Sequence, residues 1–126
     1  MSEEPTLYAE VGGQEFFDAL VDRFYDAIEA DARIRPLYPA DLEPGKRSLA
    51  LFLGQYWGGP TTYSDTKGHP RLRMRHAPFA IGRRESEAWL DAMRGAVASA
   101  DVDPTARQRL LDYFEMAATH MVNTPG

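Results

Sequence analysis

Residues 16–28 read FFDALVDRFYDAI, and this run decides the fold class of the chain. Its apolar residues recur at spacings of three, four and one, which is the period of an α-helix and not of a strand. The spacing therefore predicts an amphipathic helix over 16–28. Gly12-Gly13 immediately before it permits a sharp corner, while Pro36 and Pro39 interrupt the chain after it, where one short helical turn over 32–37 fits.

The rest of the chain repeats the helical period. The stripes consist of Leu49, Phe52, Leu53, Tyr56 and Trp57; of Trp89, Met93, Ala96, Val97 and Ala100; and of Leu110, Leu111, Phe114, Ala117, Ala118 and Met121. Asp103 and Pro104 have the residue types of a cap and a first helical residue. Turn-forming residues dominate from Gly58 to His69, which predicts a loop. No stretch alternates long enough to require a strand, so the expected fold class is all-α.

Composition excludes several classes of protein. We expect one domain over 1–126, with 1–6 and 124–126 as flexible tails, because 126 residues suffice for a single core. A net charge of -5 and scattered basic residues argue against binding to nucleic acid, and 44% hydrophobic residues without a long apolar run argue against a membrane span. The chain has no cysteine, and its acidic N-terminus lacks the pattern of a secretory signal, so we expect a cytoplasmic protein.

Three histidines offer metal-binding chemistry. His120 suits the end of a helix, where its charge complements the dipole, and His69 precedes Pro70 with little to indicate a function. A zinc site at His69 and His76 lacks two further ligands at diagnostic spacing. His76 lies in LRMRHAPF, residues 72–79, where Pro78 limits its helix to a short one.

A metal that needs one protein ligand suits His76 better than zinc does. Haem asks the protein for a single axial imidazole and for a large apolar slot. Candidates to line such a slot are Leu49, Phe52, Phe79, Ile81, Trp89 and Met116. Ordinary core packing is the alternative explanation for each of them.

The order of several short motifs resembles one protein family over nearly the whole chain. These motifs are Gly12-Gly13, Phe24-Tyr25, Tyr38-Pro39, residues 55–60 (QYWGGP), Tyr63, Gly68-His69-Pro70, residues 71–79, Ala88-Trp89-Leu90 and Met121-Val122-Asn123. Together they resemble a truncated haemoglobin of group II, the trHbO type. The resemblance implies a two-over-two sandwich of antiparallel helix pairs around haem b.

The same resemblance implies roles for individual residues. His76 matches the proximal iron ligand, and Tyr25, Tyr38 and Trp89 match three distal hydrogen-bond donors. Gly45 falls where many globins have a distal histidine, and Leu49 lies one turn further into the pocket. The implied haem contacts are Phe52, Leu53, Tyr63, Leu72, Arg75, Phe79, Ile81 and Met116, with Arg47 and Arg73 as weaker candidates for the propionates. By pattern alone, the arginines would form a solvated basic face, and Tyr25 and Trp89 would be core residues.

Two functions follow from the resemblance, and one alternative does not need it. The first is reversible binding of dioxygen with high affinity and slow release, with NO, CO and sulfide as further ligands. The second is a haem redox enzyme, an NO dioxygenase or a peroxidase, which takes electrons from a separate reductase. The third is a small helical interaction module without a cofactor. Either a monomer or a homodimer is compatible with the sequence.

Overall fold

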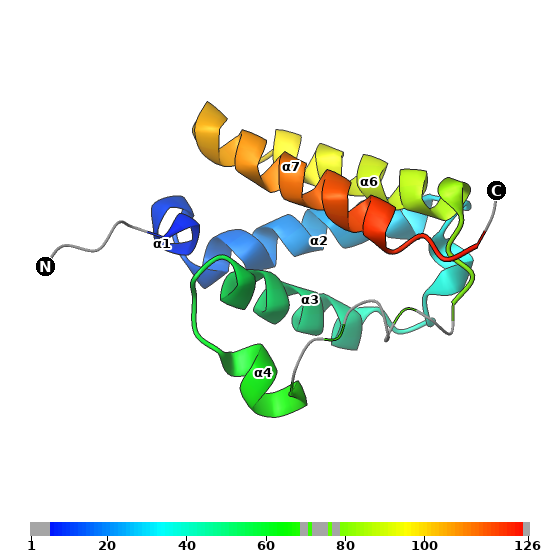
Figure 1. Cartoon of the computed structure of the whole chain (residues 1–126), viewed down its shortest axis with the longest axis horizontal. Helices are drawn as coiled ribbons and strands as arrows, with labels where there is room; N and C mark the ends of the chain where they lie inside the picture. The colour runs from blue at the N-terminus through cyan, green and yellow to red at the C-terminus, as the bar shows by residue number, and fades with distance from the viewer. Residues whose placement is uncertain (1–5, 69–70, 72–75, 77–78, 125–126) are drawn as a thin grey trace, which may run out of the picture.

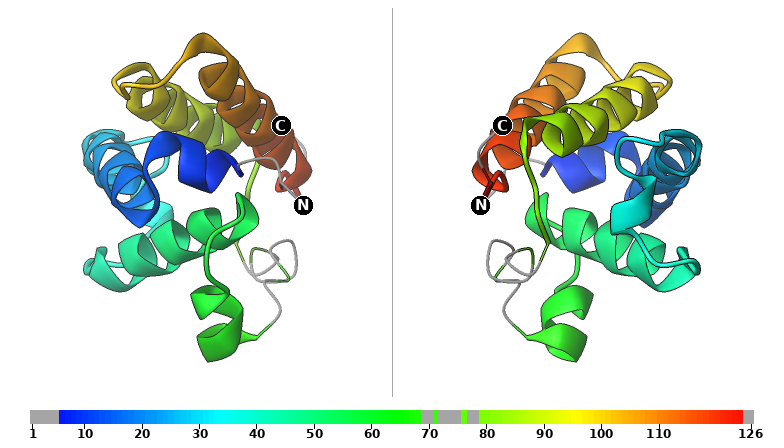
Figure 2. Two further views of the ribbon diagram at one scale, coloured as in Figure 1. Left: turned by 90° about the vertical axis from the view of Figure 1, so that its left-hand side faces the viewer. Right: turned by 90° about the vertical axis from the view of Figure 1, so that its right-hand side faces the viewer.

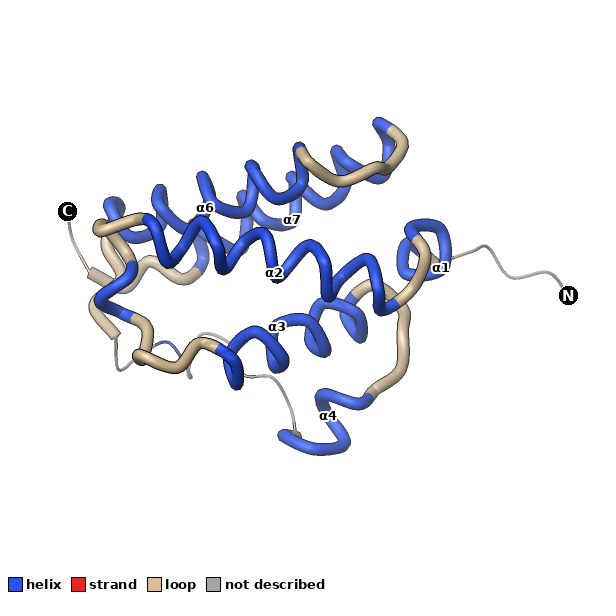
Figure 3. Tube along the Cα trace, turned by 180° about the vertical axis from the view of Figure 1, so that it is seen from behind, coloured by secondary structure: helices blue, strands red, loops and turns tan. Residues whose placement is uncertain are grey.

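The computed structural model describes residues 6–68, 71, 76 and 79–124. Every element in this part of the chain is a helix, as Figure 3 shows, so the all-α prediction is confirmed. The elements are α1 (Leu7–Val11), α2 (Gln14–Ala30), the 3-10 helix η1 (Arg35–Leu37), α3 (Glu43–Tyr56), α4 (Thr62–Lys67), α6 (Arg83–Ala98) and α7 (Pro104–His120). Among the described residues, no helix has the length and the apolar character needed to span a membrane.

The long helices form two layers. Helix α2 packs on α3, α6 packs on α7, and the two pairs meet mainly where α2 crosses α6 (Figure 1). The end-on views of Figure 2 show the α6–α7 pair above the α2–α3 pair, with α4 beyond α3. This is the two-over-two arrangement that the resemblance implied.

Helix α2 is the centre of the core because its apolar stripe faces both neighbours. Phe17, Leu20, Phe24 and Ile28 are 0% exposed, and each recurs one helical turn after the previous one. Burial of such side chains contributes roughly 1.5–3 kcal/mol each to folding. The corner before α2 uses the left-handed region at Gly12 and Gly13, with φ of 107° and 80°, as the glycine pair predicted.

The helices of the second pair begin at side-chain caps. The Asp103 carboxylate accepts a hydrogen bond from the backbone N–H of Ala106 at 2.8 Å, and Pro104 opens α7, which confirms that prediction. At the start of α6, the Glu85 carboxylate accepts from the backbone N–H of Gly82 at 2.8 Å. These caps fix where both helices begin.

The structure corrects the expected boundaries in three places. Helix α3 begins at Glu43, well before its first apolar stripe residue, because Pro44 is compatible with a first helical turn. The segment expected as a loop contains α4, in which the Thr66 hydroxyl donates to the Thr62 carbonyl at 2.9 Å. Thr6, expected in a tail, caps α1 by accepting from the backbone N–H of Ala9 at 3.1 Å.

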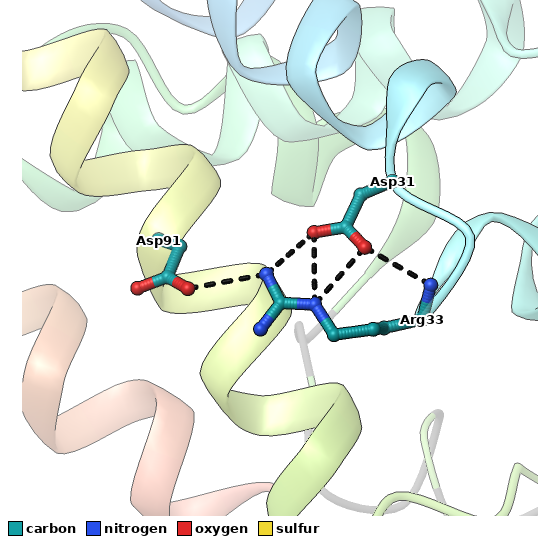
Figure 4. Close-up of polar contacts among 3 residues, drawn as sticks. All are labelled: Asp31, Arg33 and Asp91. Atoms are coloured by element: carbon teal, nitrogen blue, oxygen red, sulfur yellow. Dashed lines mark hydrogen bonds and ion pairs between the residues drawn. The ribbon is translucent and has the colours of Figure 1, made fainter.

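An arginine ties the end of α2 to α6. Figure 4 shows Arg33 between Asp31 and Asp91, with its Nη2 at 2.6 Å and 3.1 Å from their carboxylates. The hydrogen bonds from Arg33 hold the pKa of the Asp31 carboxyl below its usual range. This bridge joins the C-terminal end of α2 to α6 shortly before η1 begins.

Candidate functional site

A cavity of about 340 Å³ lies between the two helix pairs. Side chains from α2, residues 34–39, α3, α4, α6 and α7 line it together with His76, Phe79 and Ile81, and most of them are apolar. The lining includes Tyr25, Tyr38, Gly45, Ser48, Leu49, Phe52, Leu53, Tyr63, His76, Phe79, Ile81, Ser86, Trp89, Tyr113 and Phe114. An apolar cavity with a few convergent polar groups is the usual form of a cofactor site.

The three polar residues expected on the distal side meet at this cavity. Tyr25 lies on α2, Tyr38 directly follows η1, and Trp89 lies on α6. The rings of Tyr25 and Tyr38 contact edge to face, with centroids 5.7 Å apart. Trp89 contacts Phe24 and Phe114, and its ring centroid is 5.5 Å from that of Phe24 and 5.9 Å from that of Phe114. Aromatic packing therefore fixes the donors from several elements at once.

The two phenols are held in their neutral form. Burial raises the pKa of Tyr25 to about 12. The pKa of Tyr38 is also raised, first by burial and then by the proximity of Tyr25. Neither hydroxyl, nor the indole N–H of Trp89, has a hydrogen-bond partner within the part of the chain that the structure describes. All three donors thus remain available to a group bound in the cavity.

His76 reaches the cavity from the segment between α4 and α6. It is partly buried and lines the cavity together with Phe79 and Ile81. The His76 carbonyl accepts a hydrogen bond from the backbone N–H of Phe79 at 3.0 Å, which closes a turn. The expected proximal and distal residues therefore share one cavity.

Helix α3 supplies one wall of the cavity. Gly45, Leu49, Phe52 and Leu53 all line it, and Phe52 contacts Tyr63 of α4 with ring centroids 5.5 Å apart. Leu53 and Tyr63 are 1% and 5% exposed, so they belong to the core as well as to the cavity. These expected haem contacts are accordingly brought together.

Other expected contacts are not at the cavity. Met116 is 54% exposed and lies in a separate surface depression with His120, so its predicted place in the pocket is wrong. It follows Phe114 and precedes Ala117 on α7, and the helical rotation between these positions turns Met116 outward. Leu72, Arg75, Arg73 and His69, for which the sequence predicted or weighed a role, lie outside the described residues, and Arg47 does not line the cavity.

Sequence reasoning missed several lining residues. Ser48 and Tyr113 line the cavity and are partly buried, although neither belongs to an apolar stripe. Ser48 lies one turn after Gly45 and one residue before Leu49, a placement that could have indicated it. Ser86 also lines the cavity, but its hydroxyl donates to the Ala118 carbonyl at 2.8 Å and so joins α6 to α7.

The donor set suits a cofactor that brings most of its own metal ligands. Within the described residues, no three His, Cys, Asp or Glu side chains lie close enough to hold a metal ion. One imidazole, broad apolar walls and three unbonded polar donors are present instead. This combination fits haem, whose porphyrin needs apolar contact and whose iron needs an axial imidazole.

Comparisons with known proteins agree with this interpretation. The family model described as bacterial-like globin matches residues 6–123. Group 2 truncated hemoglobin YjbI of Bacillus subtilis (strain 168) is 39% identical over 111 residues, which cover 88% of this chain and 84% of the relative.

Two solved structures have nearly the same fold. The hemoglobin of the thermophilic phototrophic bacterium Chloroflexus aurantiacus has a TM-score of 0.94 at 55% identity, covering 96% of this chain and 100% of that one. A truncated haemoglobin of Bacillus subtilis, described as oxygen-avid, has a TM-score of 0.89 at 37% identity, covering 94% and 100%.

Proposed function

The chain belongs to the bacterial-like globin family, as a truncated haemoglobin of group II, and from this premise we propose that it holds haem b through His76 and binds dioxygen tightly. Globins carry haem and bind small diatomic ligands such as dioxygen. The observation that carries the finer proposal is that His76, Tyr25, Tyr38 and Trp89 all line one cavity. In core packing alone, nothing would require these four polar side chains to converge.

His76 is proposed as the protein ligand of the iron. Its neutral imidazole offers one nitrogen to the metal, while the other ring nitrogen can donate a hydrogen bond. Haem, when bound, supplies an iron at which a diatomic ligand attaches. Phe52, Phe79 and Ile81 would give the porphyrin apolar contact. Tyr63 is proposed to contact a propionate through its hydroxyl.

Tyr25, Tyr38 and Trp89 are proposed to donate hydrogen bonds to the ligand. Their aromatic neighbours hold them in place, and the Tyr25 phenol is a proton donor at neutral pH because its ordinary pKa of 10.0 is already well above 7 and burial raises it further. Each hydrogen bond contributes roughly 1 kcal/mol, and more to a charged acceptor, so two or three slow ligand release by on the order of a hundredfold. High oxygen affinity with slow release follows, and the oxygen-avid relative of Bacillus subtilis supports this expectation. NO, CO and sulfide are small enough to use the same site.

The visible spectrum of the purified protein with added haem tests the proposal. We expect a Soret band and a spectral change on addition of oxygen to the reduced protein. His76→Ala should lose the histidine-ligated spectrum, whereas His120→Ala should keep it, because His120 is exposed at the end of α7. Absence of a Soret band, or an unchanged one in His76→Ala, would contradict the proposal.

A second candidate function is peroxide reduction or NO dioxygenation with electrons from a separate reductase. Tyr113 lines the cavity, and Tyr56 is 49% exposed. The centroids of their two rings are 4.3 Å apart. This contact offers a short path for electrons between the cavity and the surface. Steady turnover of NO or hydrogen peroxide with a reductant would support the enzyme, whereas reaction in a single turnover only would argue against it.

A further inference from the structure

His76, Phe79 and Ile81 are hydrogen-bonded to a residue that lies more than forty positions later in the sequence. Asn123 follows α7, yet its side-chain Nδ2 donates to the carbonyls of Phe79 at 2.9 Å and His76 at 3.3 Å. Its Oδ1 accepts a hydrogen bond from the backbone N–H of Ile81 at 2.9 Å. One exposed side chain thus satisfies three backbone groups of one segment.

The backbone around Asn123 adds to the same junction. The backbone N–H groups of Asn123 and Thr124 both donate to the Ile81 carbonyl, at 2.8 Å and 3.2 Å. Both the N–H and the carbonyl of Ile81 are therefore hydrogen-bonded to the residues that follow α7. Phe114, on α7 itself, lines the cavity, so this junction connects one cavity wall with the segment of His76.

Only a carboxamide of this length matches the groups present. Two carbonyl oxygens require two donor hydrogens, and one N–H requires an acceptor, which an asparagine side chain supplies together. A carboxylate would keep the acceptor for Ile81 but would place negative charge against the carbonyls of His76 and Phe79. An aliphatic side chain would leave the Ile81 N–H and the Phe79 carbonyl to water, and the His76 carbonyl would keep only its hydrogen bond from the backbone N–H of Phe79.

We propose that Asn123 is a positioning residue for His76, and that its hydrogen bonds to the 76–81 segment set how firmly the protein holds haem iron. The proposal rests on the proposed function of His76 as iron ligand. Asn123 does not line the cavity, so it would touch neither the haem nor the ligand. It would act by fixing the backbone that carries His76, and thereby how the imidazole is presented to a haem iron.

The test compares Asn123→Leu, Asn123→Asp and Asn123→Gln in the haem-loaded protein. Haem loss to an excess of a high-affinity apoglobin should be on the order of tenfold faster in Asn123→Leu, since the lost hydrogen bonds of roughly 1 kcal/mol each hold the backbone of His76 and act on the iron only through it. Asn123→Asp should lose haem at least as fast, and Asn123→Gln should fall between wild type and Asn123→Leu. Resonance Raman spectra of the reduced, ligand-free protein should show a shifted iron–histidine stretching frequency in the same order.

A matched control separates positioning from general loosening of α7. Gln108 is an exposed carboxamide on α7 that donates only to Asp112, at 2.7 Å, so Gln108→Ala should behave as wild type. Hydrogen exchange gives a readout without haem chemistry, because the amide proton of Ile81 should exchange faster in Asn123→Leu. If Asn123→Leu does not fold, Asn123→Gln carries the same comparison.

The outcomes distinguish this inference from the proposed function. If wild type binds haem but Asn123→Leu and Asn123→Asp match it in haem loss and in iron–histidine frequency, Asn123 does not position His76. Equal acceleration in Gln108→Ala would also overturn the proposal. If wild type itself shows no histidine-ligated haem, the proposed function fails, and this inference fails with it.

Discussion

The hydroxyl of Tyr25 occupies the space that a side chain at Gly45 would need, since a Cβ at position 45 would lie 2.8 Å from that oxygen. A carbon and an oxygen that are not bonded to each other do not approach so closely, so one of the two atoms would have to move. Gly45 therefore makes room for the phenol of Tyr25 at the cavity wall. The Tyr25 hydroxyl can take its observed position only because residue 45 has no side chain.

Gly45→Ala should displace the Tyr25 hydroxyl and raise the rate of oxygen dissociation. Loss of one hydrogen bond of roughly 1 kcal/mol corresponds to a change of about fivefold. Gly95→Ala on α6 is the control, because a Cβ there meets no atom within 4 Å. Stopped-flow measurement of oxygen release decides the matter, and equal rates in wild type and Gly45→Ala would show that the hydroxyl does not act on the ligand.

Trp89→Phe should release oxygen about fivefold faster than wild type or more, because the one hydrogen bond from the indole N–H is lost while the aromatic packing against Phe24 and Phe114 is largely kept. Trp57→Phe provides a comparison in which an indole outside the cavity is removed. The same stopped-flow experiment measures both variants. A rate in Trp89→Phe equal to that of wild type would remove Trp89 from its assigned role.

The raised pKa of Tyr25 predicts how stability depends on alkaline pH. The folded protein binds this proton more tightly than the unfolded chain, so the contribution is fully present below the ordinary pKa of 10.0 and is lost as the pH rises through about 12. It amounts to at most about 3 kcal/mol, at roughly 1.4 kcal/mol for each pH unit.

Denaturant unfolding at a series of pH values measures this loss. Tyr25→Phe should show a shallower loss of stability between pH 10.0 and about 12 than wild type. Tyr8→Phe serves as the control, because the Tyr8 ring lies outside the cavity. A pH dependence that is identical in Tyr25→Phe and wild type would contradict the assignment.

The bridge from Arg33 to Asp31 and Asp91 should contribute a small, salt-sensitive part of stability. Arg33→Met removes both ion pairs, and we expect a modest decrease in Tm that shrinks as salt is added, because partly exposed pairs are screened. Hydrogen bonding to Arg33 lowers the pKa of Asp31, so its contribution is present above the ordinary carboxyl pKa and is lost as the pH falls through the lowered value. Arg94→Met, which breaks the more exposed pair with Glu115, provides the comparison. If the decrease in Tm from wild type to Arg33→Met were equal at low and high salt, the expectation would be contradicted.

Helical periodicity predicted the elements whose stripes face the core. The run over 16–28 became α2, and the cap at Asp103 marked the start of α7, because apolar spacing and capping are local properties of the chain. Helix α4 escaped prediction because its residues, TYSDTK, are common in turns. Its Tyr63 is buried against Phe52, a contact between helices that no local pattern reveals.

The cavity could be predicted in part. Tyr25, Tyr38 and Trp89 were indicated by a resemblance, whereas the pattern alone would have placed Tyr25 and Trp89 in an ordinary core. Met116 was misplaced because a helix carries apolar residues on its exposed side as well. Asn123 appeared only as part of a motif, since its partners lie more than forty residues earlier and a local pattern contains no distance between them.

The hydrogen bond between Asn123 and His76 also bears on when haem can be bound during translation. The two residues are 47 positions apart, so His76 leaves the ribosome well before its partner has been made. Helices α2 and α3 can begin to pack in the nascent chain, since their contacts need no later segment. The hydrogen bond from Asn123 to the His76 carbonyl forms only after residue 123 has been made. We therefore expect haem uptake to be a late step, which follows translation of residue 123 instead of guiding the folding of the first helix pair.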